Sequence, residues 1–234
     1  DGFSLIRKIL DQIDNLEIQI IKEEVKEIKN LEVITDNNIY SASNIILATG
    51  RKPRILGLQN ENELIGKGIS FCASCDGNLF KNEEVAVVGG GNTAFEEALY
   101  LSNICSKVYL IHRSDNYRAE NYLINELKQK QNVFLMPNEI ITKLNTKDGY
   151  LESIETDKNK YNIKALFVAI GQVPSIIKIE GLETDNGYIK VNNKMETNIN
   201  GIYACGDCIK KDVYQLTTAA SDGTIAATSI INRC

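Results

Sequence analysis

The chain has 234 residues, of which 43% are hydrophobic and 24% are charged, and its formal net charge at pH 7 is −5. This composition is typical of an ordinary globular protein with one large domain or two small ones, and it excludes collagen-like chains and disulfide-dense mini-proteins. An acidic chain of this size is a poor candidate for nucleic-acid binding, because phosphate backbones are bound by clustered Lys and Arg. The single histidine, His112, argues against a catalytic triad and against a multi-histidine metal site.

The sequence carries no signal for export or for membrane insertion. It has no run of 18 apolar residues, and its first residues lack the apolar core and the cleavage site of a secretory signal. Its six cysteines do not make a disulfide framework in a chain of this length. We therefore expect a cytoplasmic protein without a membrane partner, in which a close cysteine pair is catalytic or metal-binding.

The N-terminal region predicts one helix followed by short strands. Residues 4–15 place their apolar side chains on one stripe of a helix. Short strands are expected at 17–21, 24–28 and 31–35, followed by a turn at Asn37-Asn38 and an apolar run at 44–48 that is typical of a buried parallel strand. Residues 51–57, with Pro53 and Gly57, have the composition of a connector.

The middle of the chain predicts a βαβαβ unit followed by a meander. The expected strands are 84–88, 107–111 and 133–136, the helices are 92–103 and 119–131, and β-rich stretches at 139–145 and 150–156 precede a last buried strand at 165–169. After Gly171 the pattern of the first region returns, with strands at 187–191 and 201–204 and a closing helix at 213–232. The expected fold class is α/β, with one Rossmann-like nucleotide-binding domain inserted into another.

A glycine-rich loop lies between the strand expected at 84–88 and the helix expected at 92–103. It reads Gly89-x-Gly91-x-x-Ala94, and this strand–loop–helix context is what the dinucleotide fingerprint requires. The first glycine permits the tight turn, the second lets the backbone approach a pyrophosphate, and the small third residue lets the helix pack closely on the strand. The helix N-terminus then favours the anion. The alternative is a plain strand–helix turn.

The end of the next expected strand carries positive charge. NAD-specific folds place an acid there to bind the ribose hydroxyl, whereas this chain has His112-Arg113, with Arg118 shortly after. Positive charge suits a 2′-phosphate and favours NADPH. The alternative is a solvated basic turn.

Two Cys-x-x-Cys segments are present. Cys72 and Cys75 are followed directly by Asp76; at this spacing two cysteines can close a small disulfide ring, and the motif tends to lower the pKa of one thiol. The thiolate is the species that exchanges with another disulfide, and Asp76 is placed to move a proton to or from it. Together with Cys205 and Cys208, the pair has the spacing of a four-cysteine zinc site. We nevertheless expect no metal, because the Gly-Asp inside the second pair belongs to another motif.

Together these motifs resemble the bacterial-type low-molecular-weight thioredoxin reductases of the class II pyridine nucleotide-disulfide oxidoreductase family. The motifs follow the family's order over essentially the whole chain. They are Ala48-Thr49-Gly50, the Cys72–Gly77 segment, Gly89–Ala94 followed by Glu96-Glu97, His112-Arg113 with Arg118, Gly201–Asp207, and Tyr214-Gln215-Leu216.

The resemblance implies two Rossmann-like nucleotide-binding domains of the three-layer ββα type, with the NADPH domain inserted into the FAD domain. The FAD domain would comprise residues 1–53 and 172–234, and the NADPH domain with the redox-active pair would comprise 54–171. The catalytic residues would be Cys72, Cys75 and Asp76. The NADPH contacts would be Gly89, Gly91, Asn92, Thr93, Ala94, Glu97, His112, Arg113, Arg118 and Ile170. The FAD contacts would be Val25 near the adenine, Thr49, Gly50, Gly206, Asp207, Tyr214, Gln215 and Leu216.

Three departures from the family pattern stand out. Ser114 replaces the second of two consecutive arginines, which leaves NADH or another donor open. Tyr214 stands where an arginine often precedes the flavin-side glutamine. The strand–glycine-loop–helix unit that holds the FAD pyrophosphate is absent, and the chain starts at Asp1 without an initiator Met, so we expect a sequence truncated at its N-terminus.

The function that the resemblance implies is a homodimeric thioredoxin-disulfide reductase that serves cell redox homeostasis. Electrons would pass from NADPH through FAD to the Cys72–Cys75 disulfide and on to thioredoxin, with Cys75 against the flavin and Cys72 attacking the partner. One alternative is a related flavin disulfide reductase that feeds a peroxiredoxin or uses ferredoxin or NADH, although the glycine loop and Arg113 argue against ferredoxin. The others are an inactive fragment with an incomplete FAD site and a non-catalytic nucleotide-sensing or zinc-binding module.

Overall fold

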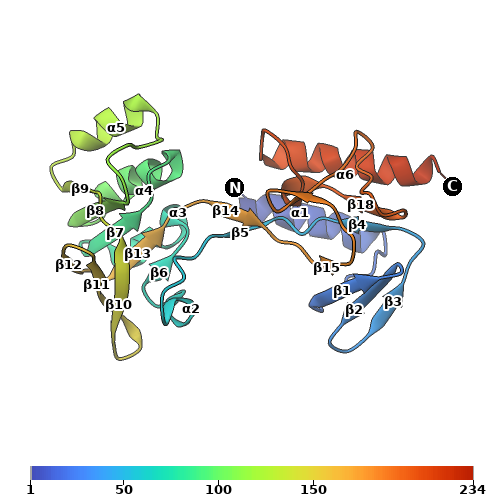
Figure 1. Cartoon of the computed structure of the whole chain (residues 1–234), viewed down its shortest axis with the longest axis horizontal. Coiled ribbons are helices and arrows are strands. Elements are labelled where there is room, and N and C mark those ends of the chain that lie inside the picture. Colours follow the sequence, from blue (N-terminus) through green and yellow to red (C-terminus); the bar gives the residue numbers. More distant parts are fainter. Residues whose placement is uncertain (1, 234) are drawn as a thin grey trace. The chain divides into compact units, whose positions relative to one another are not determined.

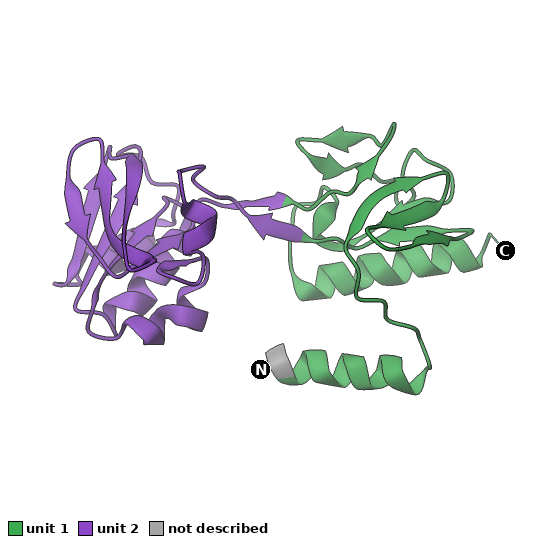
Figure 2. Cartoon of the chain, turned by 90° about the horizontal axis from the view of Figure 1, so that it is seen from below, with its two compact units in different colours: residues 1–50, 174–234 green, residues 51–173 purple. Residues whose placement is uncertain are grey.

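The computed structural model describes residues 2–233 as two compact units (Figure 1). Unit 1 consists of Asp1–Gly50 and Pro174–Cys234, and unit 2 consists of Arg51–Val173, so unit 2 is inserted into unit 1 along the chain (Figure 2). These boundaries lie two or three residues from those expected at 53/54 and 171/172. The chain passes between the units through β5 (Arg51–Pro53) and β14 (Gln172–Pro174), which pair with each other.

Unit 2 is built on a five-stranded parallel sheet. Its strand order is β6-β13-β7-β8-β9. The strands are β6 (Ile69–Ser70), β7 (Glu84–Val88), β8 (Lys107–His112), β9 (Val133–Pro137) and β13 (Ala165–Val168). Apolar runs form these central strands because side chains on both faces of the sheet are buried.

The two faces of this sheet have different covers. Val85 and Val87 point to the face covered by α4 (Asn92–Ser102) and α5 (Asn121–Lys128), whereas Ala86 and Val88 pack in the second core. That second core includes side chains of an antiparallel sheet made of β10 (Ile141–Lys147), β11 (Tyr150–Thr156) and β12 (Lys160–Asn162). The result is the expected three-layer ββα arrangement (Figure 1).

Unit 1 contains three small sheets and two long helices, and in the third sheet residues 184–185 pair with 188–189. The first sheet has the order β15-β1-β2-β3, and in the second β4 (Ile45–Leu47) pairs in parallel with β18 (Ile202–Ala204). The remaining elements are β1 (Val25–Lys29), β2 (Glu32–Thr35), β3 (Ile39–Ser41), β15 (Lys178–Ile179), β16 (Thr184–Asp185), β17 (Tyr188–Ile189), α1 (Gly2–Asn15) and α6 (Leu216–Ile231). The side chains of Ile28, Leu47, Ile189 and Ala204 form the centre of its core.

The strand expected at 17–21 is wrong. The described backbone is irregular from Ile18 to Glu24, Glu17 has a left-handed φ of 56°, and Leu16, Ile18 and Ile20 are exposed. Alternating hydrophobicity forms a strand only where a neighbouring strand accepts its hydrogen bonds, and no such neighbour lies beside this segment in the described structure.

Four short elements were not predicted from the sequence. They are α2 (Glu61–Leu64), α3 (Ala73–Asp76), and the 3-10 turns Gly77–Phe80 and Gly206–Cys208, and of these α3 and the second turn lie in the cysteine segments. None of the helices within residues 2–233 combines the length and the apolar character needed to cross a bilayer.

Candidate functional site

The predicted NADPH and redox residues of unit 2 lie at one edge of its sheet. Cys72 follows β6, the glycine loop follows β7, His112 ends β8, and Ile170 follows β13. All these strands are parallel, so their carboxyl ends meet at the same edge. After β7 the chain continues to β8 and β9 on one side, whereas β13 lies on the other side. The glycine loop is thus at the switch point of the sheet, where open α/β sheets bind ligands.

The glycine loop requires its small residues. Gly89 has a φ of 154°, and a Cβ there would collide with the carbonyl oxygen of Ala169 and crowd the Cβ of Ala94. A Cβ on Gly90 would collide with the ring of His112. A Cβ on Gly91 would meet no atom within 4 Å, so the loop is open on this side, where α4 begins without a side-chain cap. An open loop before a helix N-terminus fits a phosphate group.

The end of β8 brings a histidine and two arginines together. The His112 ring packs on Tyr117 at 5.5 Å between centroids, and its Nε2 lies 3.3 Å from the Ser114 hydroxyl. Burial, followed by the charges of Arg113 and Arg118, lowers the pKa of His112, so this ring is neutral at pH 7. Both arginines are exposed. Ser114 therefore serves to hold the ring, and the cations available to a 2′-phosphate are the two arginines.

Asn92 and Thr93, the first two residues of α4, complete the predicted NADPH loop. The Asn92 side chain accepts a hydrogen bond from the Glu120 backbone N–H (2.9 Å) and donates one to the Glu120 carboxylate (3.1 Å). Thr93 is exposed. Asn92 thus fixes the start of α5 relative to the start of α4, directly after the glycine loop.

Cys72 and Cys75 form a disulfide in unit 2. Cys72 lies two residues after the end of β6 and has an extended backbone. Helix α3 begins at the next residue. Cys75 is exposed and Cys72 is half-buried, so the disulfide lies at the surface of the chain. The carboxylate of Asp76 accepts a hydrogen bond from the Ser70 hydroxyl (2.7 Å), and the same hydroxyl accepts one from the Cys72 N–H (3.1 Å).

Two residues that support the disulfide were not predicted in this role. Ser70 links Asp76 to the Cys72 backbone, as just described, and only its position two residues before the first cysteine could have indicated it. Glu97 on α4 accepts a hydrogen bond from the backbone N–H of Ala73, between the two cysteines (3.4 Å). Sequence resemblance assigned Glu97 to NADPH; its contact with the cysteine segment depends on the packing of α3 against α4.

Four of the predicted FAD residues of unit 1 lie at the carboxyl ends of β4 and β18. These strands are paired, and the Cys205 N–H donates to the carbonyl of Leu47 (2.9 Å), so the Thr49-Gly50 and Gly206-Asp207 segments leave neighbouring strands. The Thr49 hydroxyl donates to the Ser175 carbonyl. Gly50 has a φ of 65°, and a Cβ there would meet nothing within 4 Å, so open space adjoins this turn.

Helix α6 connects with the same edge through Asp222. Asp222 on α6 accepts hydrogen bonds from the Gly206 N–H (3.3 Å) and from Lys211 (2.8 Å), and Lys211 also lies 3.6 Å from the Asp207 carboxylate. Gln215 and Thr218 cap the helix reciprocally.

The other predicted FAD residues are less closely tied to this edge. Tyr214 packs on Tyr188 at 5.6 Å between centroids, and Leu216 is 64% exposed. Val25 begins β1 in the other sheet and packs against the unit 1 core.

The second cysteine pair differs from the first. Cys205 and Cys208 are free and buried in unit 1, whereas Cys72 and Cys75 of unit 2 are bonded to each other. Disulfide sulfurs cannot act as thiolate ligands, and residues 2–233 hold no cluster of three or more His, Cys, Asp and Glu side chains suited to a metal ion. In the disulfide form, Cys72 and Cys75 are therefore not available as thiolate ligands.

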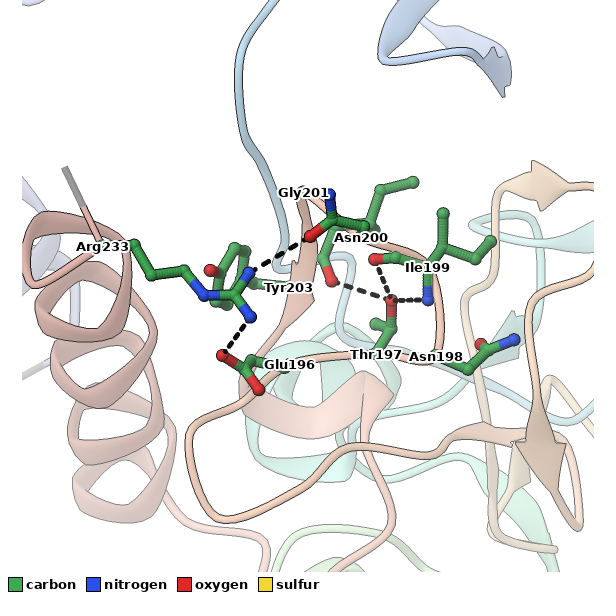
Figure 3. A pocket seen from close by; sticks show the side chains of 9 residues that line it. Glu196, Thr197, Asn198, Ile199, Asn200, Gly201, Tyr203 and Arg233 are labelled. Atoms are coloured by element: carbon green, nitrogen blue, oxygen red, sulfur yellow. Dashed lines mark hydrogen bonds and ion pairs between the residues drawn. The ribbon is translucent and has the colours of Figure 1, made fainter.

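A small polar cavity of about 220 Å³ lies elsewhere in unit 1 (Figure 3). Arg233 reaches over it to pair with Glu196 (3.1 Å) and to donate to the Asn200 side chain (3.3 Å), and Thr197 donates to the Ile202 carbonyl (2.8 Å). None of the predicted site residues lines it. These polar groups mainly satisfy one another, which indicates a structural role in holding the 196–203 loop against the end of α6.

Comparison with known proteins places these features in a family. Residues 5–223 match the model of the pyridine nucleotide-disulphide oxidoreductases. A thioredoxin reductase of Buchnera aphidicola subsp. Acyrthosiphon pisum (strain APS) is 44% identical over 212 residues, covering 83% of this chain and 66% of the relative. A thioredoxin reductase of Escherichia coli O157:H7 is 38% identical, covering 97% of this chain and 77% of the relative.

Solved structures agree with the sequence relatives. The crystal structure of Lactococcus lactis thioredoxin reductase in its FR conformation superposes with a TM-score of 0.82 at 29% identity, covering 99% of this chain and 80% of that chain. The T. acidophilum thioredoxin reductase gives a TM-score of 0.74 at 29% identity, covering 90% and 73%. The chain thus spans about two thirds to four fifths of the length of these relatives. It belongs to the pyridine nucleotide-disulphide oxidoreductase family, and the relatives named here are thioredoxin reductases.

Proposed function

We propose that this protein is an NADPH-dependent thioredoxin-disulfide reductase, in which electrons pass from NADPH through FAD and the Cys72–Cys75 pair to thioredoxin. The observation that carries the proposal is the surface disulfide at the same sheet edge as the glycine loop of unit 2, in a chain whose relatives are thioredoxin reductases. The same relatives support FAD and NADPH as the cofactors and thioredoxin as the substrate.

Unit 2 offers groups that fit NADPH. The open side of Gly91 and the start of α4 at Asn92 and Thr93 would take the pyrophosphate, and Arg113 and Arg118 would take the 2′-phosphate. Glycine at 89 and alanine at 94 keep the loop close to the sheet, as the collision of an added Cβ indicates. Ile170 follows β13 on the other side of the switch point, which supports a place for it beside the nicotinamide half of the nucleotide.

Unit 1 offers groups that fit part of FAD. Thr49 and Gly50 leave β4 beside open space, and Gly206 and Asp207 leave the neighbouring β18. Tyr214, Gln215 and Leu216 precede and begin α6, which Asp222 joins to the Gly206 backbone. We propose that these residues bind FAD, with Val25 near the adenine.

The bound cofactors would supply the two electrons that reduce the disulfide. The sulfur–sulfur bond of Cys72 and Cys75 then breaks, and the pair takes up two electrons and two protons. Asp76, held by the Ser70 hydroxyl, would move a proton at the cysteine sulfurs. Cys72 as a thiolate attacks the thioredoxin disulfide to form a mixed disulfide, and Cys75 attacks Cys72, releasing thioredoxin as a dithiol and restoring the starting bond.

The test is turnover of purified protein supplied with FAD, NADPH and oxidised thioredoxin, with the new thioredoxin thiols counted by a chromogenic thiol reagent. Cys75→Ser should lower turnover by about 1,000-fold or more, because without Cys75 the mixed disulfide has no resolving thiol. Cys105→Ser, which changes a buried thiol away from the site edge, is the matched control and should keep turnover. A C75S protein that still reduces thioredoxin at the wild-type rate would overturn the proposal.

Further arms of this experiment separate the alternatives. Replacing NADPH by NADH or by reduced ferredoxin identifies the electron donor, and replacing thioredoxin by a peroxiredoxin identifies the acceptor. Flavin absorbance that stays with the protein after gel filtration shows whether the chain binds FAD. The homodimer rests on the family resemblance, and sedimentation equilibrium of the purified protein tests it. The cytoplasmic location rests on the sequence features described above.

A further inference from the structure

Glu97 lies in an unusual environment beside the cysteine pair. It sits on α4, the helix that begins directly after the glycine loop, and its Oε1 accepts the N–H of Ala73 at 3.4 Å. Ala73 is only 1% exposed and is the residue that follows Cys72. The Cys72 side chain does not cap this turn, so a carboxylate from a different helix supplies the acceptor.

The second oxygen of the same carboxyl is unsatisfied. Glu97 Oε2 is buried and has no hydrogen-bond partner among the described residues. A buried carboxylate oxygen without a donor is costly, so this site favours the protonated form. Burial accordingly raises the pKa of Glu97 to about 7; the Ala73 N–H opposes the shift and the charge of Glu96 adds to it. The group is therefore half-ionised near neutral pH.

Reduction of the disulfide would change the charge near Glu97. The elements that pack against α4 bring Asp76 on α3, Glu84 on β7, Lys107, Tyr109 and His112 on β8, and Glu126 and Lys128 on α5. Of all charged neighbours, Glu96 is the one whose effect on Glu97 stands out. The oxidised pair is uncharged, whereas a thiolate at Cys72 or Cys75 adds a negative charge within two residues of Ala73, whose N–H Glu97 binds. Two nearby like charges disfavour each other.

We propose that Glu97 is a positioning residue for the cysteine pair, which anchors the backbone between Cys72 and Cys75 to the helix after the glycine loop and links its own proton to thiolate formation in that pair. The inference rests on the proposed function, because the link matters only if the pair cycles between disulfide and dithiol. An ionised Glu97 opposes the thiolate, and a protonated Glu97 permits it. Reduction near neutral pH is then accompanied by proton uptake at this carboxyl as well as at sulfur.

The experiment measures thiol reactivity without any cofactor. The purified chain is reduced with dithiothreitol, freed of it, and alkylated with iodoacetamide over about pH 5 to 10, and the labelled Cys72 and Cys75 peptides are quantified by mass spectrometry. Glu97→Gln should be labelled about three- to tenfold faster than wild type at about pH 8, where the wild-type carboxylate is charged. The two rates should converge below about pH 6, where that carboxyl is protonated.

Two further variants separate charge from geometry. Glu126→Gln removes an exposed charge from the neighbouring helix α5 and should follow wild type. Glu97→Ala also removes the acceptor for the Ala73 N–H; if E97A altered the profile and E97Q did not, the role would be structural only. Coincident wild-type and E97Q profiles, or an equal shift in E126Q, would overturn the proposal.

The pH dependence of folding gives a second readout. Folding raises the pKa of Glu97 from 4.5 to about 7, so the unfolded chain loses this proton first. Relative to E97Q, wild type should therefore lose stability to urea as the pH rises through this window, with the loss complete above it. A constant difference between the two proteins contradicts the inference. Neither readout uses NADPH, FAD or thioredoxin, so a wrong role for Glu97 and a wrong overall function would appear in different experiments.

Discussion

The two Cys-x-x-Cys segments of this chain share a local shape and differ in chemistry. The first cysteine segment, residues 72–75, follows β6, and the second, residues 205–208, follows β18. Cys72 and Cys205 are both extended, with φ of −151° and −150°, and both lead into a short helical turn. Yet the first segment holds a disulfide at the surface, whereas the second holds two free thiols that are at most 5% exposed.

The neighbours of each segment account for the difference. The second segment is locked to β4, because Cys208 Sγ lies 3.5 Å from the Leu47 carbonyl and the Cys205 N–H donates to that carbonyl. Burial, and then Cys208 and Asp222, raise the pKa of Cys205, which keeps it protonated. The first segment has one half-buried and one exposed cysteine. Spacing therefore does not decide whether a cysteine pair is reactive; burial and charged neighbours do.

The largest expected effect concerns thiol reactivity in the two segments. After reduction by dithiothreitol, Cys72 and Cys75 should be alkylated at least about 100-fold faster than Cys205 at neutral pH, because only an accessible thiolate reacts. Peptide mass spectrometry of timed samples measures the rates. Cys105, whose pKa burial raises to about 11, serves as an internal slow reference. Labelling of Cys205 within tenfold of Cys75 would erase the distinction between the segments.

A smaller effect is expected for the acid that holds each segment. Asp222 is 13% exposed and binds the Lys211 ammonium and the Gly206 N–H, whereas Asp76 receives the neutral Ser70 hydroxyl. Asp222→Asn should lower the free energy of unfolding by about 2 kcal/mol, and Asp76→Asn by about 1 kcal/mol, because Asp222 binds a cation and a backbone N–H whereas Asp76 binds one neutral hydroxyl. Urea denaturation of both variants measures the losses. Equal losses in the two variants, or a larger loss in D76N, would show that the second segment is not held by its ion pair.

The smallest effect concerns the residue after the first cysteine, which is Ala73 in one segment and Gly206 in the other. Gly206 has a φ of 75°, a left-handed conformation that an L side chain adopts only with strain. Gly206→Ala should therefore destabilise the protein by about 1 kcal/mol, although a Cβ there would have ordinary contacts. Gly223→Ala in α6 is the matched control and should stabilise by up to about 1 kcal/mol, since it removes a helical glycine with open space around it. Thermal unfolding measures the change in stability of each variant. A change of the same sign in both variants would contradict this interpretation.

The elements that the sequence predicted correctly are those with strong local patterns. The strand at 84–88 is confirmed with the expected bounds because its residues are buried on both faces of a parallel sheet, and the helix expected at 92–103 is confirmed as α4. The strand expected at 17–21 was wrong although its alternation is clear, because pairing with a neighbour decides strand formation. The two-residue strand β6 was missed, because so short a run has no periodicity.

For the candidate site, the sequence and the tertiary structure contribute different parts. The order and spacing of Cys72, Cys75, Gly89 and Gly91 were enough to predict a dinucleotide loop and a redox-active pair. The links to Ser70 and Glu97 were not predictable, since they depend on the packing of α3 against α4 and not on sequence distance.

By itself, the sequence determined the family, the α/β class and the residue types available for chemistry, because these depend on composition, local periodicity and motif spacing. Only the tertiary structure decided that the bonded pair, Cys72 and Cys75, lies at the surface and that Cys205 and Cys208 are buried free thiols. It also placed a carboxyl with one unsatisfied oxygen beside the bonded pair. The physical reason is that burial and hydrogen-bond partners come from strands and helices far apart in the chain, and these set the pKa and the accessibility of each sulfur and carboxyl group.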